Sequence, residues 1–139
     1  MGPLSASDIV RRAYEGWNTQ DLDELASIYH PEAVYDASER ILNPEVYRGH
    51  EELRRFGEEI MRDWRSFTIE LQDLIPVGDD RVIALHHSTA VGQSSGVEVQ
   101  ETDSATLWTV GGGQVVHAKL FLDRSDAFAE AGIPYSQTE

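Results

Sequence analysis

An α+β fold is the class that the sequence predicts, and two patterns along the chain support it. In three segments before residue 65, at residues 7–17, 21–29 and 49–64, the apolar residues recur every three or four positions, which is typical of amphipathic helices. From residue 67 onward they alternate with polar residues, and glycine-containing segments at 78–80, 92–96 and 111–113 divide the alternation into separate stretches. Helices followed by a meander of strands predict helices gathered on one face of a curved antiparallel sheet.

Three helices are expected in the first half of the chain. Ser7 is a good N-cap for the first helix, whose apolar residues fall on one face up to Trp17. Asp21 can cap a second, shorter helix that ends before His30-Pro31. The third helix, over residues 49–64, has apolar residues three and four apart with Glu and Arg between them.

The remaining elements are mostly strands. A short strand over residues 33–36 and a polar, irregular loop over residues 37–48 connect the second and third helices. Asp123 can cap a last short helix, and Gly132 supplies the residue that commonly ends one. The strands of the meander are expected near residues 67–76, 81–91, 97–110 and 114–122.

The length of 139 residues suits one domain spanning the whole chain, with residues 1–6 and 134–139 expected to be flexible. The chain has 25 acidic against 11 basic residues, and its formal net charge is −14. Such a surface repels phosphates, so neither nucleic acid nor an anionic membrane is an expected partner. No apolar run approaches the ~20 residues of a membrane span. The first residues lack the features of a signal peptide, so a cytoplasmic location is expected.

The sequence contains no cysteine, which excludes disulfides, thiolate nucleophiles and sulfur-ligated metals. The five histidines show no pair at the spacing of a metal-binding helix, and no acidic cluster has the spacing of a calcium loop. The sequence therefore predicts no metal site and no cofactor.

Several short motifs occur in an order that resembles one known family. They are Trp17-Asn18-Thr19-Gln20-Asp21-Leu22, Ala33-Val34-Tyr35-Asp36, Tyr47-Arg48-Gly49, Ser95-Gly96-Val97-Glu98-Val99 and Phe121-Leu122-Asp123-Arg124. With these motifs the chain resembles, over nearly its whole length, the SnoaL-like and ketosteroid-isomerase-like branch of the NTF2-like superfamily. The resemblance implies an NTF2-like cone, in which three N-terminal helices pack on a strongly curved antiparallel sheet, followed by a short C-terminal helix. It also implies a deep apolar pocket and a homodimer formed through the outer sheet face.

The resemblance implies a proton-shuttling carboxylate at the end of the first strand, and Asp36 stands in that position. An apolar cone would raise the pKa of this carboxyl toward values useful to a general base. The alternative is a surface aspartate that caps the loop beginning at Ala37. The isomerases also place a tyrosine and a second acid in the cone, and here Ala13 and Ala105 stand in those positions.

His86 and His87 are adjacent on a strand, so their side chains project to opposite faces of the sheet. Matching to the family places His87 toward the cone and His86 toward the outer face. An imidazole can act as an acid, a base or a hydrogen-bond donor near neutral pH. The alternative for His87 is a buried histidine satisfied by a neighbour such as Asp103 or Tyr14.

The remaining candidates are expected to line the pocket and contact a ligand. They are Tyr14, Trp17, Tyr47, Asp103, Leu107, Ala118 and Leu120. The function predicted in this way is a pocket for a small, apolar, polyketide- or terpenoid-like molecule. Asp36 and His87 would be the catalytic pair for proton transfer in an isomerisation, cyclisation, dehydration or hydration. The alternative is a ligand-binding or dimerisation module without catalysis.

Overall fold

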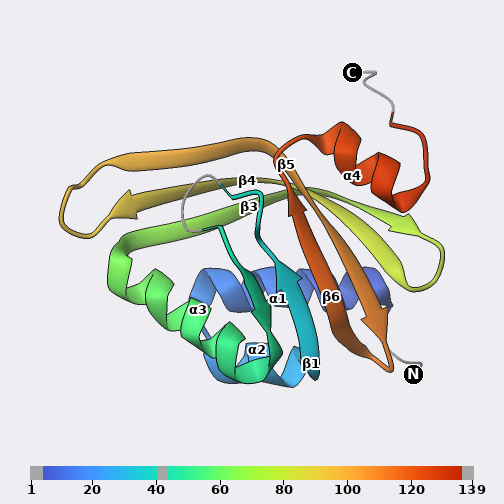
Figure 1. Cartoon of the computed structure of the whole chain (residues 1–139), viewed down its shortest axis with the longest axis horizontal. Coiled ribbons are helices and arrows are strands. Elements are labelled where there is room, and N and C mark those ends of the chain that lie inside the picture. Colours follow the sequence, from blue (N-terminus) through green and yellow to red (C-terminus); the bar gives the residue numbers. More distant parts are fainter. Residues whose placement is uncertain (1–4, 41–43, 136–139) are drawn as a thin grey trace.

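The structure is a computed structural model that describes residues 5–40 and 44–135. Within those residues it contains four helices and a six-stranded sheet (Figure 1). The outer parts of the two predicted flexible ends, residues 1–4 and 136–139, lie outside the described residues, as do residues 41–43 of the predicted loop. The elements follow the chain as α1 (Ala6–Thr19), α2 (Leu22–Ile28), β1 (Tyr29–Asp36), β2 (Val46–Arg48), α3 (Gly49–Asp63), β3 (Trp64–Val77), β4 (Arg81–Gly92), β5 (Glu98–Gly111), β6 (Gln114–Phe121) and α4 (Arg124–Ala131).

The helix boundaries follow from side-chain caps. Ser5, rather than the predicted Ser7, caps α1, because its Oγ accepts a hydrogen bond from the backbone N–H of Asp8 at 3.1 Å. Asp21 caps α2 as predicted, with its Oδ1 accepting from the N–H of Glu24 at 3.1 Å. Gly132 ends α4 in the left-handed conformation, with φ of 79°, which also agrees with the sequence.

The sheet has the order β2-β1-β6-β5-β4-β3. The strands from β3 to β6 form the predicted antiparallel meander. In contrast, β1 pairs with β6 in parallel, with Tyr35 opposite Ala118 and Asp36 opposite Lys119. The sheet is therefore mixed and not antiparallel throughout, because the direction of a strand depends on its distant partner and not on its local pattern.

Two strand boundaries differ from the sequence prediction. β1 begins at Tyr29, directly after α2, and continues through His30-Pro31. Inside the predicted loop, Val46–Arg48 forms the short edge strand β2, in which Tyr47 pairs with Tyr35. Three residues are too few to show an alternating pattern, so only the pairing with β1 reveals this strand.

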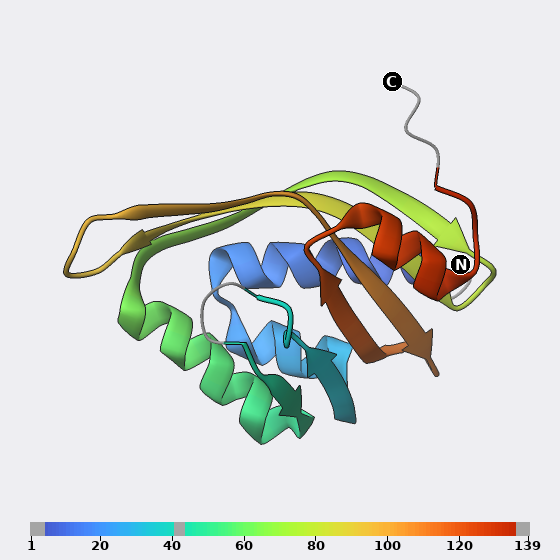
Figure 2. The ribbon, with the colours of Figure 1, turned by 45° about the horizontal axis from the view of Figure 1, so that its top comes forward.

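The sheet curves over α1, α2 and α3, while α4 lies on its opposite face (Figures 1 and 2). A large core fills the concave side and includes Val10, Trp17 and Trp108. A smaller core on the other side joins Phe128 of α4 to Ile83 and other apolar residues of the sheet. The expectation that all helices share one face is wrong for α4. The strands beneath α4 are apolar on both faces, and alternation does not show which apolar face a helix covers.

Within the described residues, no helix has both the length and the apolar composition that crossing a bilayer requires.

Candidate functional site

A small cavity lies between α1, α3 and the concave face of the sheet. Water-sized molecules can occupy about 40 Å³ of it. Most of its walls are aromatic and come from Tyr14, Trp17, Tyr29, Tyr35, Phe56 and Trp108. A few polar side chains interrupt these walls, namely Arg40, His86, Ser88, Glu101 and Thr106. Apolar walls with a few directed polar groups are typical of small-molecule sites.

The aromatic walls are held together by hydrogen bonds from two indole groups. Trp108 Nε1 donates to Tyr14 Oη at 3.1 Å, and Trp17 Nε1 donates to Tyr29 Oη at 3.0 Å. The rings of Tyr14 and Trp108 also meet edge to face, with their centroids 5.4 Å apart. Burial raises the pKa of Tyr14 and of Tyr29 well above the usual value for tyrosine, so both hydroxyls stay protonated.

His86 projects from β4 into this aromatic surrounding and is only 4% exposed. Its Nε2 lies 2.8 Å from Thr106 Oγ1, and its ring centroid lies 5.8 Å from that of Tyr14. Its other nitrogen, Nδ1, is buried and has no hydrogen-bond partner among the described residues. Burial, and to a smaller extent the positive charge of Arg124, lowers the pKa of His86 to about 4. At neutral pH the imidazole is therefore uncharged and can offer one nitrogen to a ligand.

A cation and a carboxylate line the same cavity. The guanidinium of Arg40 lies 5.2 Å from the ring centroid of Phe56 and 5.9 Å from that of Phe67. Glu101 enters from β5, and its Oε1 accepts a long hydrogen bond from Ser88 Oγ at 3.4 Å. Arg40 also lines two smaller pockets that adjoin this cavity, so its side chain occupies space that a ligand could use.

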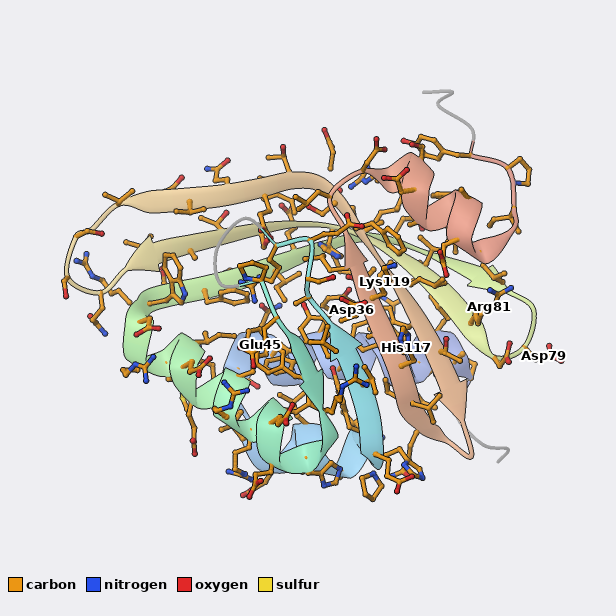
Figure 3. All side chains as sticks on the ribbon, in the orientation of Figure 1. Asp36, Glu45, Asp79, Arg81, His117 and Lys119 are labelled. Atoms are coloured by element: carbon orange, nitrogen blue, oxygen red, sulfur yellow. The ribbon has the colours of Figure 1, made fainter. Side chains whose placement is uncertain are left out.

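Asp36, the predicted base, does not line this cavity. Tyr35 faces the cavity, so its neighbour Asp36 projects to the other side of the sheet, beside His117 and Lys119 (Figure 3). Asp36 Oδ1 accepts hydrogen bonds from Ser38 N at 3.0 Å and from Ser38 Oγ at 2.6 Å. Partial burial raises the pKa of this carboxyl, but the Ser38 hydrogen bonds and the nearby charges of Lys119 and His117 outweigh it. The net result is a lowered pKa. The predicted position in the cone and the raised pKa are both wrong, and Asp36 instead caps the turn after β1.

The structure also reverses the predicted directions of the two adjacent histidines. His86 faces the cavity, whereas His87 shares the outer face with Leu85, which packs near α4. Inward- and outward-facing residues alternate along a strand, so an error of one residue in matching to the family exchanges the two faces. Irregular pairing adds to this, because the register between β4 and β5 shifts between His86 and Ser88.

The same one-residue error affects two candidates on β5. Leu107 packs in the core beneath α4 together with Ala105. The prediction that Leu107 lines the cavity is therefore wrong. Asp103 lies at the register shift with a positive φ of 56°, and its side chain is 82% exposed. Its Oδ1 lies 3.8 Å from Arg124 Nη1 on the α4 side, so the predicted place at the pocket mouth is wrong. Thr106 is the residue of this segment that reaches the cavity.

Three of the other candidates lie where the sequence predicts. Tyr14, Trp17 and Leu120 line the cavity. Ala118 is fully buried in the same concave core. Tyr47 lies behind the cavity wall, with its ring centroid 4.5 Å from that of Phe56, and lines a smaller pocket with Arg40.

Comparison with known proteins gives the family and the fold of this chain. Residues 10–118 match the family model of the SnoaL-like domain. The chain belongs to the SnoaL-like domain family. No curated protein matches its sequence.

Similar solved structures show that this SnoaL-like domain has the NTF2-like fold. An NTF2-like protein from Burkholderia thailandensis has a TM-score of 0.76 and 21% identity, covering 94% of this chain and 99% of its own. A proposed SnoaL-like polyketide cyclase from Jannaschia has a TM-score of 0.71 and 20% identity, covering 97% and 98%. An epoxide hydrolase from M. tuberculosis has a TM-score of 0.69 and 14% identity, covering 89% and 86%. At these identities the similarity concerns the fold.

Several polar residues of the SnoaL-like cavity were not found from the sequence. Arg40 lies in an irregular loop, where no periodicity indicates the direction of a side chain. Glu101 and Thr106 lie on either side of the register shift in β5, so simple alternation fails between them. Within residues 5–40 and 44–135, no group of three or more His, Cys, Asp or Glu side chains is placed to hold a metal ion.

Proposed function

We propose that this SnoaL-like domain binds one small, mostly aromatic or apolar molecule in the central cavity, through a hydrogen bond to His86. The observation that carries the proposal is that His86 lines the cavity and that its Nδ1 is buried with no partner among the described residues. Leaving such a polar atom unsatisfied costs about 1–3 kcal/mol. A ligand hydroxyl or carbonyl at this nitrogen would remove that cost. The low pKa of His86 favours a neutral ligand group over an anion.

The ligand must displace part of the cavity lining. Typical ligand pockets enclose roughly 300–1,000 Å³, whereas water-sized molecules occupy only about 40 Å³ here. Arg40 is the side chain best placed to move, because it lies against Phe56 and Phe67 at the end of a turn. When Arg40 swings away, the aromatic walls offer room for a polyketide- or terpenoid-like molecule.

Proton transfer is the second candidate function, and the presence of Glu101 in the same cavity favours it. Glu101 would remove a proton from a carbon next to a ligand carbonyl, and the electron pair of that bond would move to the carbonyl oxygen. A hydrogen bond from the His86 imidazole would stabilise the resulting enolate. Return of the proton from Glu101 to another carbon would complete an isomerisation without any cofactor.

We also propose the homodimer through the outer sheet face. His87 and Thr89 are only half-buried on that face, where their side chains lie 3.4 Å apart. The core beneath α4 includes Leu85 of the same strand but neither His87 nor Thr89. Sedimentation equilibrium tests this assembly, and a monomer at all concentrations would exclude it.

Thermal unfolding against a panel of aromatic ketones, phenols and epoxides tests the binding proposal. A ligand present at about 100 times its dissociation constant stabilises the fold by ~2.7 kcal/mol, which raises the midpoint by several degrees. The adjacent histidines provide a matched pair of variants, His86→Leu and His87→Leu. We expect the ligand-induced shift to disappear in His86→Leu and to persist in His87→Leu. Equal shifts in both variants, or no shift with any compound, would contradict the proposal.

A further inference from the structure

A second cavity lies on the helical side of the molecule, between α1, α2 and α3. Water-sized molecules can occupy about 160 Å³ of it, against about 40 Å³ in the central cavity. Its apolar walls come mainly from Leu22, Leu25, Ala26 and Leu53. An apolar cavity of about 150 Å³ in another protein holds one benzene molecule. The helical cavity is thus large enough for a single small ring.

A wall of two aromatic side chains separates the two cavities. Trp17 and Tyr29 line both of them. Trp17 Nε1 donates to Tyr29 Oη at 3.0 Å, and the two rings meet edge to face with their centroids 6.4 Å apart. The N–H group of Trp17 is therefore satisfied within the wall. The helical cavity has its own lining and is a distinct site.

Two basic side chains of α3, His50 and Arg54, complete the lining of the helical cavity. His50 Nε2 lies 2.8 Å from the carbonyl oxygen of Tyr29, which can only accept, so this nitrogen carries a proton. That hydrogen bond fixes the imidazole at the cavity. The Arg54 guanidinium brings a positive charge to this site although the whole chain has a net charge of −14.

The ion pair that Arg54 forms with Asp23 is weak, so a ligand carboxylate can take the place of Asp23. Arg54 Nη2 donates to Asp23 Oδ1 at 2.9 Å, but the Asp23 side chain is 95% exposed. An ion pair as exposed as this one contributes about 0–1 kcal/mol. A carboxylate whose apolar body fills the cavity gains burial in addition to the charge, so it competes well with Asp23 for Arg54.

We propose that the helical cavity binds a small carboxylate with an apolar body of about the size of benzoate. The ring would lie among Leu22, Leu25 and Leu53, and the carboxylate would accept hydrogen bonds from Arg54. A neutral molecule of the same shape would gain the burial but not the charged hydrogen bonds. The class of ligand is therefore defined by the combination of one ring-sized apolar body and one negative charge.

A methyl NMR titration with benzoate tests this proposal and distinguishes the two cavities. The methyl groups of Leu22 and Leu53 report on the helical cavity, whereas those of Ile69 and Leu120 report on the central one. We expect benzoate to shift the first pair and to leave the second pair unchanged. Benzyl alcohol, which has a similar shape and no charge, should bind at least about tenfold more weakly, because it lacks the charge-assisted hydrogen bonds.

Three variants test the two components of the site. Arg54→Gln should weaken benzoate binding about tenfold and leave the affinity for benzyl alcohol unchanged. Ala26→Leu fills the cavity and should abolish binding of both molecules. Arg55→Gln is the matched control, since the neighbouring Arg55 is bonded to Glu45 and Glu59 away from the cavity, and it should bind benzoate like the wild type.

Four results would overturn the proposal. One is the absence of any methyl shift at benzoate concentrations up to about 10 mM, ten times a dissociation constant of about 1 mM. The second is a set of shifts confined to Ile69 and Leu120, which would place benzoate in the central cavity. The others are equal affinities for benzoate and benzyl alcohol, and equal losses of affinity in Arg54→Gln and Arg55→Gln. Because the reporters of the two cavities differ, failure here would leave the proposed role of the central cavity unaffected.

Discussion

His86 Nε2 and Thr106 Oγ1 lie 2.8 Å apart across the neighbouring strands β4 and β5, and both side chains are buried. This hydrogen bond uses one nitrogen of the imidazole and holds the ring against the aromatic cavity. The second nitrogen, Nδ1, then remains for a ligand. The pair of residues therefore connects the packing of the sheet to the proposed chemistry of the site.

Thr106→Val should destabilise the fold by about 1–3 kcal/mol, because it leaves a second nitrogen of His86 buried without a partner. Valine has nearly the shape of threonine, so packing changes little. The measurement is the free energy of unfolding in urea. The control is Thr89→Val, since Thr89 is half-buried and makes only a long contact with His87. Equal effects of the two substitutions would show that the Thr106–His86 contact contributes nothing.

The stability should depend on pH through His86. Its pKa is lowered to about 4 in the folded state from 6.5 in a free side chain. Between these values the unfolded chain binds a proton that the folded chain does not, so stability is full above pH 6.5 and falls as the pH drops toward 4. The protonation of His86 alone should lower the free energy of unfolding by about 3 kcal/mol.

Unfolding free energies at pH 7 and pH 4.5 measure this dependence. The loss between the two pH values should be clearly smaller in His86→Leu, while His87→Leu should behave like the wild type. The same loss in His86→Leu as in the wild type would mean that other groups cause it.

Arg40→Ala should speed the entry of a central-cavity ligand. The side chain lies over Phe56 and Phe67 in the space that the ligand needs, and a required rearrangement slows association. Loss of the cation–π contacts should also lower the free energy of unfolding by about 0.5–1 kcal/mol. Stopped-flow quenching of tryptophan fluorescence by a panel ligand gives the association rate. Arg62→Ala, on the exposed part of α3, is the control, and slower association in Arg40→Ala would contradict the gating role.

Glu101→Gln and Asp36→Asn should differ in their effect on any proton-transfer activity. Glu101 lines the cavity, so its amide variant should abolish turnover and retain ligand binding. Asp36 bonds Ser38 on the other side of the sheet, so its variant should retain both. Activity assays with a panel ligand and a thermal-shift control for binding separate the two cases. Loss of turnover in Asp36→Asn alone would restore the base predicted from the family resemblance.

The fold could be predicted from the sequence because each long element has its own local pattern. α3 shows the helical period and β3 to β6 show alternation between glycine turns, so their positions were predicted to within a few residues. Asp21 and Gly132 mark helix ends through side-chain and backbone chemistry that acts locally. The parallel pairing of β1 with β6 and the side on which α4 packs depend on contacts between distant segments, which no local pattern records.

The site was harder to predict because most of its polar residues lie on strands, and the sequence must show which face of the sheet each side chain is on. Tyr14 and Trp17 were found, since the face of a regular helix follows from spacing. His86 and His87 were exchanged, since a single residue reverses the faces of a strand and the irregular pairing near Asp103 hides the register. Arg40 follows a turn, and its direction depends on its contacts with two rings of other elements.

The most direct test of the central proposal is ¹⁵N NMR of the histidine side chains during titration with a ligand from the panel. We expect the Nδ1 resonance of His86 to shift as the ligand binds. The resonances of His87, on the outer face, should stay in place. A ligand that binds without moving the His86 resonances, or that moves those of His87 instead, would contradict the assignment of the central cavity as the binding site.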